Sequence, residues 1–200
     1  MDFYDINKQL EQINPAVNLC RVEELRSLYN HVLLLPEKSN IVELGSYCGG
    51  SSYVLAQVAR QIDSKLICVD KFKEGFDGQY FTGQRARDEW HRVMSGQEDV
   101  VTLIDKDTAA AREEYEKLFD VEPRFLFVDA GHEYSEVFSD LQNWGSSVYF
   151  GGYIALHDYN HSGFPGIKMA FDEFVRYWNL EVEEVDNVIS MRTYRIIRCR

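Results

Sequence analysis

The sequence has few cysteines, and they form no pattern. Cys20, Cys48, Cys68 and Cys199 are scattered along the chain and include no C-x-x-C pair. Such spacing argues against a disulfide framework or a structural zinc site. Because disulfides persist mainly in oxidising compartments, their expected absence indicates a cytoplasmic protein.

Long apolar runs and an excess of positive charge are also missing. No stretch approaches the roughly 20 apolar residues of a membrane span, and the start, MDFYDINKQLEQ, carries charges where a signal peptide is apolar. The chain holds 21 Lys and Arg against 33 Asp and Glu, a formal net charge of −12. Phosphate backbones and anionic lipids would repel it, so we expect no nucleic-acid or membrane partner.

The chain does have the length and composition of one globular domain. Of its 200 residues, 45% are hydrophobic and 27% are charged, which is enough to bury a substantial core. Apolar residues recur at helical spacing over 4–13 and 19–35, and Pro36 ends the second segment. We interpret residues 1–39 as an N-terminal helical appendage and residues 40–200 as the main domain.

Short apolar strands alternate with helical segments from residue 40 onward. Strands are predicted at 40–46, 65–72, 100–107, 123–132 and 151–161, and helices at 51–62, 84–95, 108–119, 135–144 and 166–178. Two further strands, 180–186 and 188–198, have no helix between them and predict an antiparallel hairpin at the sheet edge. The pattern predicts a doubly wound, Rossmann-like α/β fold: a mostly parallel seven-stranded sheet with an antiparallel C-terminal hairpin strand and helices on both faces.

Polar residues gather where the predicted parallel strands end. A glycine turn at 45–50 follows the first strand, and Asp70 ends the second. Asp129 and His132 end the fourth strand, and Asp158 ends the fifth. In open α/β sheets, ligands bind at the carboxyl ends of the strands. This convergence is the main functional signal in the sequence.

The glycine turn, in IVELGSYCGGS at 41–51, does not fit a dinucleotide. In G-x-G-x-x-G the middle glycine lets a pyrophosphate approach the backbone, and Tyr47 stands at that position. This counts against a nicotinamide-dependent oxidoreductase. Glu43 would repel a phosphate but suits a cationic ligand, and Asp70 can accept hydrogen bonds from both hydroxyls of a ribose. A nucleoside with a cationic group is therefore favoured; a turn that serves only strand-to-helix packing is the alternative.

S-Adenosylmethionine (SAM) has this chemistry, with an adenosine, an ammonium, a sulfonium and no phosphate. The stretch ELGSYCGGS resembles the first motif of the catechol-type, metal-dependent O-methyltransferases, which belong to the class I SAM-dependent methyltransferases. The resemblance covers residues 40–200. It implies a cofactor site with Glu43 and Ser51 at the amino-acid end, Gly45, Tyr47 and Gly49 in the turn, Asp70 at the ribose, Asp107 and Thr108 by the adenine, and Asp129.

The second half of the chain resembles a narrower group. FVDAGHEYSEVFSDLQNW, GGYIALHDY and GIKMAFDEF are similar to segments of the macrocin-type sugar O-methyltransferases. By this resemblance Asp129 and Asp158 bind a divalent metal and His132 is the general base. A neutral hydroxyl is a poor nucleophile and needs a base or a metal that lowers its pKa. We expect Mg²⁺, which prefers oxygen ligands, and a small polar acceptor such as a sugar or natural product.

The third metal ligand departs from the family patterns. The catechol-type enzymes place Asp-Asn at the fifth strand tip and some relatives place Glu-Asp, whereas this chain has His157, Asp158 and Tyr159. His157 is either a ligand, which would shift the preference towards Mn²⁺, Fe²⁺ or Zn²⁺, or a buried, hydrogen-bonded histidine. Asp129 and Asp158 could instead cap the helices that follow, and His132 could be a loop histidine.

Three interpretations of function therefore stay open. The first is a metal-assisted O-methyltransferase, the second a metal-independent one in which His132 or His157 acts alone, and the third a non-catalytic SAM-binding module. Loop aromatics form a candidate wall or lid over the pocket: Tyr80, Phe81, Tyr134, Tyr159 and Phe164. The N-terminal helices and the terminal hairpin are candidate surfaces for a homo-oligomer.

Overall fold

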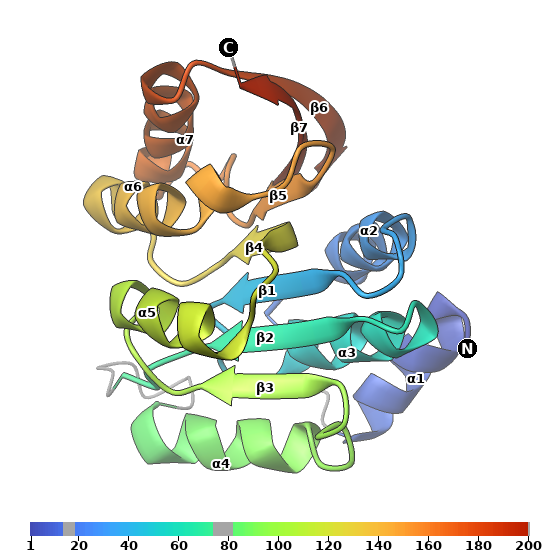
Figure 1. Ribbon diagram of the computed structural model, residues 1–200. Helices are drawn as coiled ribbons and strands as arrows, with labels where there is room; N and C mark the ends of the chain where they lie inside the picture. Colours follow the sequence, from blue (N-terminus) through green and yellow to red (C-terminus); the bar gives the residue numbers. More distant parts are fainter. Residues whose placement is uncertain (14–18, 74–81, 200) are drawn as a thin grey trace.

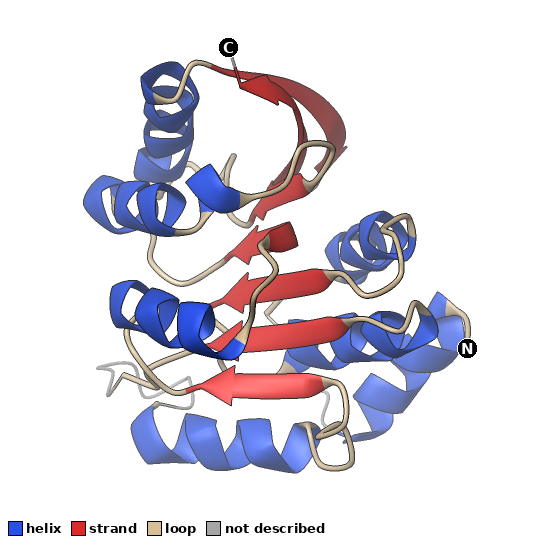
Figure 2. Cartoon of the chain, in the orientation of Figure 1, coloured by secondary structure: helices blue, strands red, loops and turns tan. Residues whose placement is uncertain are grey.

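The computed structural model describes residues 1–13, 19–73 and 82–199, without the side chains of residues 198 and 199. One sheet runs through the molecule with helices on both faces (Figures 1 and 2). Its strands are β1 (Asn40–Leu44), β2 (Lys65–Val69), β3 (Val101–Ile104), β4 (Pro123–Val128), β5 (Tyr153–Leu156), β6 (Leu180–Val188) and β7 (Met191–Cys199). The α-helices are α1 (Phe3–Ile13), α2 (Val22–Leu33), α3 (Gly50–Gln61), α4 (Gly83–Val93), α5 (Thr108–Leu118), α6 (Tyr134–Asn143) and α7 (Pro165–Tyr177).

The strand order is β3-β2-β1-β4-β5-β7-β6, which confirms the predicted fold class. Strands β1 to β5 are parallel, and β7 is antiparallel to both β5 and β6. The chain winds outward in one direction from β1 and in the other from β4. A crevice opens at such a switch point in doubly wound sheets, so a ligand site is expected beside the ends of β1 and β4.

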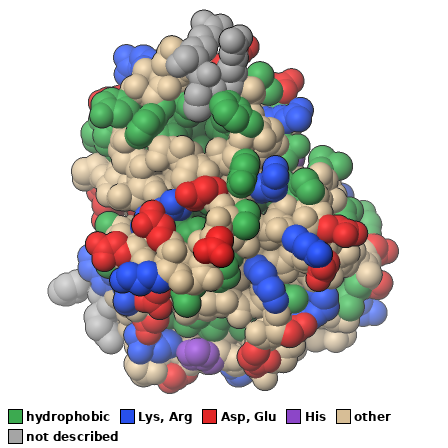
Figure 3. Space-filling model, viewed as in Figure 1, with side chains coloured by type: hydrophobic (Ala, Val, Ile, Leu, Met, Phe, Trp, Pro, Cys, Tyr) green, Lys and Arg blue, Asp and Glu red, His purple; other side chains and the backbone are tan. Residues whose placement is uncertain are grey.

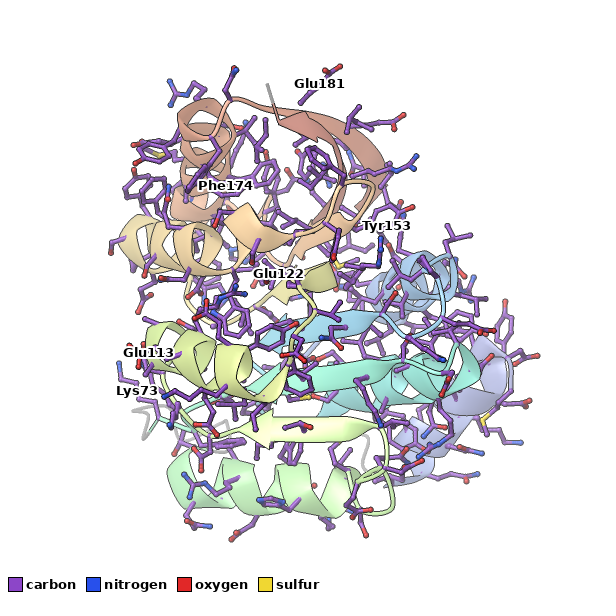
Figure 4. The ribbon with its side chains drawn as sticks, viewed as in Figure 1. Lys73, Glu113, Glu122, Tyr153, Phe174 and Glu181 are labelled. Carbon is purple, nitrogen blue, oxygen red and sulfur yellow. The ribbon has the colours of Figure 1, made fainter. Side chains whose placement is uncertain are left out.

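Each face of the sheet has its own hydrophobic core, because successive strand residues point to opposite faces. On β1, Ile41 packs with side chains of α1 to α4, whereas Val42 and Leu44 pack with side chains of α5 to α7. Phe174 of α7, labelled in Figure 4, is fully buried in the second core. Ile6 of α1 lies in the first core, so the N-terminal helices share a core with the sheet.

The parallel strands end earlier than predicted. Strand β2 ends at Val69, β4 at Val128 and β5 at Leu156, so their polar residues lie in the turns just beyond the sheet. Side chains in turns are not fixed by ladder pairing, and they need other contacts to hold them in place. The structure supplies those contacts through hydrogen bonds described below.

The surface and the thiols fit the expectations from composition. Lys and Arg side chains are interspersed with Asp and Glu over the face in Figure 3. The cysteines whose side chains are described, Cys20, Cys48 and Cys68, are free and buried. No helix in the described part of the chain is long and apolar enough to cross a membrane.

Candidate active site

A cavity of about 1060 Å³ opens at the carboxyl ends of the parallel strands. Its wall includes Gly45 after β1, Asp70 after β2 and Asp107 after β3. Asp129 after β4 and Asp158 after β5 complete this series. The arrows of the parallel strands in Figure 1 point to this edge of the sheet. The cavity is large enough for a ligand of nucleoside size together with a second small molecule.

Carboxylates outnumber cationic side chains around the cavity. Lys73, labelled in Figure 4 at this edge, is one of three lysines that line it, against seven acidic residues. The acidic residues are Asp70, Asp107, Asp129, Glu133, Glu136, Asp140 and Asp158. The resulting field favours a ligand that carries positive charge over one that carries phosphate.

The turn after β1 requires glycine at position 45. Gly45 has φ +88°, and a Cβ atom there would lie 2.3 Å from the carbonyl oxygen of Asp129. Its N–H donates to the carbonyl oxygen of Val69 over 2.8 Å, and the Asp129 N–H donates to that of Leu44 over 2.8 Å. Tyr47, which lines the cavity, has φ +47°, a left-handed conformation that is costly for a residue with a side chain. Such strain often accompanies a ligand site.

Asp70 braces this turn while facing the cavity. Its Oδ2 accepts hydrogen bonds from the backbone N–H groups of Ser46 at 2.9 Å and Tyr47 at 2.7 Å. Its Oδ1 accepts one from Phe72 at 2.6 Å. Burial raises the pKa of Asp70, and these N–H groups oppose that rise. Since a carboxylate has about four acceptor positions, the three bonds leave room for one ribose hydroxyl rather than two.

Glu43 lies behind the cavity wall. It is fully buried and accepts hydrogen bonds from Ser51 at 2.6 Å, from Ser52, and from the Cys68 thiol at 3.4 Å. Burial raises the pKa of Glu43, and the serine hydroxyls counter part of that rise. Among the described residues Ser51 lines the cavity, whereas Glu43 and Gly49 do not. Glu43 therefore holds the Ser51 side chain from behind the wall, and its place at the amino-acid end of a cofactor stays a prediction.

Asp107 and Thr108 begin α5 and both line the cavity. Asp107 is the N-cap: it accepts from the Ala109 N–H at 3.2 Å and pairs with Lys71 at 2.7 Å. Thr108 donates its hydroxyl to Asp140 over 2.5 Å. Burial raises the pKa of Asp140 to about 6 despite that bond. The cavity wall thus gains Asp140, a buried acid on α6 that the sequence pattern did not single out.

Asp129, His132 and Asp158 converge at the ends of β4 and β5. One ligand atom from each lies within 4.8 Å of the other two. The His132 Nε2 atom lies 3.2 Å from Asp158 Oδ2. This hydrogen bond raises the pKa of His132. The same bond, followed by one from His157, lowers the pKa of Asp158 well below its ordinary value.

The helix-cap interpretation of the two aspartates is wrong. The N-cap of α6 is Glu133 and that of α7 is Phe164. Asp158 instead sits in a left-handed turn with φ +52°. Neither Asp129 nor Asp158 therefore caps a helix, and both line the cavity.

The proposed aromatic wall is present in part. Phe164 lines the cavity and packs against His132, with ring centroids 4.4 Å apart. Tyr159 is buried in the core under α7, and Tyr134 donates its hydroxyl to Glu173 at 2.7 Å. Tyr80 and Phe81 lie outside the described residues. Among the described members of this set, Phe164 is the one whose ring packs against His132 and can fix its orientation.

His157 is both buried and aimed at the aspartates. Its side chain is 8% exposed, and its Nε2 lies 3.3 Å from Glu24 Oε2. Its Nδ1 lies 3.2 Å from Asp129 Oδ1 and 3.3 Å from Asp158 Oδ2, yet has no hydrogen-bond partner. Burial alone would lower the pKa of His157, but the carboxylates outweigh it and raise the pKa well above its ordinary value. Without a cation the protonated ring pairs with the two carboxylates; once its proton is displaced, Nδ1 and the carboxylates together form a donor set for a cation.

Sequence reasoning missed Glu24 and Cys20, which come from the N-terminal segment. Glu24 is 1% exposed, and Ser190 donates to its Oε1 through the backbone N–H at 3.1 Å and the hydroxyl at 2.8 Å. Cys20 lines the cavity. One signal in the sequence could have indicated Glu24. It lies four residues before Leu28, on the same face of the helix, where an apolar core residue is expected.

Comparison with known proteins gives a family and a fold. A family model described as a methyltransferase domain matches residues 42–159, more than half of the chain. That interval contains the glycine turn and all of the strand-tip residues from Asp70 to Asp158.

Three solved structures have a similar fold. CalS11, described as a calicheamicin methyltransferase and as a TDP-rhamnose 3′-O-methyltransferase, is 12% identical with a TM-score of 0.68; the match covers 96% of this chain and 91% of that one. The O-methyltransferase NovP is 18% identical with a TM-score of 0.66, over 88% and 81% of the two chains. TomG from Streptomyces achromogenes, an O-methyltransferase of tomaymycin synthesis solved with SAM, is 10% identical with a TM-score of 0.68, over 97% and 90%.

Proposed function

This chain belongs to the family of methyltransferase domains, and on that premise we propose that it is a SAM-dependent O-methyltransferase for a hydroxyl of a small polar acceptor, a sugar or a natural product. The observation that carries the proposal is the acidic cavity whose wall contains both the glycine turn and the His132–Asp158 pair. The similar folds of CalS11, described as a TDP-rhamnose methyltransferase, and of TomG, solved with SAM, support it.

The proposed cofactor site follows the wall of the cavity. Ser51, held by Glu43, and the backbone around Gly45 and Tyr47 would bind the amino-acid end of SAM. Asp70 would accept a hydrogen bond from a ribose hydroxyl. Asp107 and Thr108 would lie by the adenine. The proposed cofactor-binding domain is 40–200, and Leu19 and Cys20, which precede α2, add to the wall of its cavity.

The proposed cation site consists of Asp129, His157 and Asp158. The buried Nδ1 of His157 forms no hydrogen bond and lies beside both carboxylates, so it fits such a group once the cation displaces its proton. When bound, the cation would lower the pKa of the acceptor hydroxyl, and SAM would supply the methyl group. The two carboxylates alone favour Mg²⁺, and His157 as a third ligand shifts the preference towards Mn²⁺, Fe²⁺ or Zn²⁺.

His132 would take the proton of the acceptor. With Asp158 ionised, the His132 Nε2–H donates to Oδ2, so Nδ1 carries the lone pair. The hydrogen bond to Asp158 fixes this tautomer and raises the pKa of His132, which makes the neutral ring a stronger base. Packing of Phe164 against the ring holds its orientation.

Calorimetric titration tests the cofactor. We expect saturable binding of SAM and S-adenosylhomocysteine and none of NAD, since the acidic wall repels the pyrophosphate. Absence of binding by both sulfur compounds would overturn the proposal. Once an acceptor is found by screening, EDTA should suppress turnover. Turnover that survives EDTA would select the metal-independent alternative, in which His132 or His157 acts alone.

A pair of neighbouring serines tests the cofactor geometry. Ser51→Ala should weaken SAM binding by about 5- to 10-fold, the effect of one hydrogen bond of about 1 kcal/mol. Ser52→Ala is the matched control, because Ser52 also donates to Glu43 but does not line the cavity. Equal losses in both variants would mean that only the shared bond to Glu43 matters, and direct contact of Ser51 with SAM would be refuted.

We further propose that the protein acts in the cytoplasm, with neither nucleic acid nor membrane as partner. The free thiols and the negative net charge support this. Self-association is a proposal of the same kind, and exposed apolar side chains on α2, Leu33 among them, offer a surface for it.

A further inference from the structure

We propose that Cys20 is a ligand of the cation at this site and that Glu24 orients His157 towards it, so that the site selects a thiophilic cation such as Zn²⁺ or Co²⁺ over Mg²⁺. This inference concerns the same cavity as the proposed function and depends on that function in no other way. It adds a sulfur donor from the N-terminal segment to a ligand set that otherwise comes from the strand tips.

Glu24 determines which nitrogen of His157 is available. Its Oε2 faces Nε2 at 3.3 Å, and Ser190 holds the other oxygen, Oε1, through two hydrogen bonds. The carboxylate therefore cannot turn away from the ring without losing bonds at a position that is 1% exposed. In the neutral ring that a cation would bind, a carboxylate that accepts Nε2–H leaves the lone pair on Nδ1, which is the arrangement found behind metal-binding histidines.

Cys20 completes a compact group of three different donors. The Cys20 Sγ, an Asp129 oxygen and a ring nitrogen of His157 all lie within 4.8 Å of one another. The Nδ1–Oδ1 distance between His157 and Asp129 is 3.2 Å, and ligands of a tetrahedral cation with bonds of about 2.0 Å lie roughly 3.3 Å apart. The His157–Asp129 pair already stands near the spacing that such a cation requires, and the Cys20 Sγ lies within 4.8 Å of a ligand atom of each.

The chemistry of these donors discriminates between cations. Mg²⁺ takes oxygen ligands and keeps much of its hydration, whereas thiolate and imidazole suit Zn²⁺ and Co²⁺. Cys20 is 6% exposed and His157 is 7% exposed. A cation bound between such buried side chains would lose most of its water, which disfavours Mg²⁺. The Nδ1 of His157, which is buried, forms no hydrogen bond and lies beside two carboxylates, is the independent sign that this group of side chains suits a cation, which would displace the ring proton.

Cobalt is the probe for this proposal. The full-length protein is stripped with a chelator, returned to chelator-free buffer without oxygen, and titrated with CoCl₂. We expect a near-ultraviolet charge-transfer band from thiolate to Co²⁺, retained in a large excess of MgCl₂. Cys20→Ser should lose the band. Cys48→Ser, which removes another buried thiol that does not line the cavity, should keep it.

Glu24 is tested by the affinity of the same titration. Glu24→Gln should weaken Co²⁺ binding by about 10- to 100-fold, the usual effect of removing a carboxylate that orients a ligating histidine. Its neighbour Glu23 is exposed on α2, so Glu23→Gln should leave the affinity unchanged. Equal affinities in the two variants would overturn the orienting role.

Three results would overturn the role of Cys20: no thiolate band in the wild type, a band that survives Cys20→Ser, or displacement of Co²⁺ by Mg²⁺. Cys20→Ala replaces the serine variant if circular dichroism shows that the latter is unfolded. SAM binding is measured on the same samples. A missing band with intact SAM binding refutes only the cation inference, whereas an intact band without SAM binding refutes only the proposed function.

Discussion

Replacing His132 with alanine is expected to lower kcat by about 10²- to 10⁴-fold, the usual contribution of a general base, while SAM affinity stays unchanged. The ring faces the cavity and Asp158 orients it through a hydrogen bond of 3.2 Å. Without the ring, the proton of the acceptor has no positioned base. Steady-state kinetics measures the rate, and calorimetry with SAM measures the cofactor affinity on the same preparation.

His161 provides the matched control for this experiment. Its ring stacks on Phe164 with centroids 4.7 Å apart, much as that of His132 does at 4.4 Å. His161 is exposed and, among the described residues, is not part of the cavity wall. His161→Ala should therefore leave kcat unchanged. Wild-type turnover in His132→Ala, or an equal loss in both variants, would rule out His132 as the base.

Gly45→Ala is expected to cause the largest loss of stability. The new Cβ atom would lie 2.3 Å from the carbonyl oxygen of Asp129, and φ is +88°. The left-handed backbone alone costs an L-residue about 1–2 kcal/mol, and forced overpacking adds about 1–3 kcal/mol, so we expect a loss of roughly 2–5 kcal/mol. The displaced backbone would also move Asp129, so the folded fraction should bind SAM and the cation more weakly. Urea unfolding measures the free energy.

Gly96→Ala separates the two contributions. Gly96 has φ +83°, almost the same conformation, but nothing lies within 4 Å of an added Cβ atom. Gly96→Ala should lower the free energy of unfolding only by the cost of the left-handed backbone conformation, about 1–2 kcal/mol. If Gly96→Ala destabilises the protein as much as Gly45→Ala does, the close approach of β1 and β4 is not what requires a glycine at position 45.

The fold could be predicted because its signals are local. Period-two and period-3.6 patterns, stop signals such as Pro36, and the missing helix between the last two strands are all readable within short windows. The strand ends could not be read as well. The sequence pattern predicted a fourth strand that runs to residue 132, whereas the backbone pairing of β4 with β1 and β5 ends at Val128.

The positions of the site residues were predictable for a related reason. Parallel strands bring their carboxyl ends to one edge, so Asp70, Asp129 and Asp158 had to lie near one another. What each side chain does there was not predictable. Glu43 points to the α3 side and holds Ser51 instead of lining the cavity, because strand alternation and helix placement together decide which side it faces.

The sequence by itself determined the parallel sheet, the glycine turn and the acidic strand tips, since each depends on neighbours close along the chain. Only the tertiary structure brought Cys20 and Glu24 to His157, across a separation of 133 residues in the case of Glu24. No local pattern encodes that contact. It arises because α2 buries its apolar face against the sheet and carries Glu24 into the core with Leu25 and Leu28.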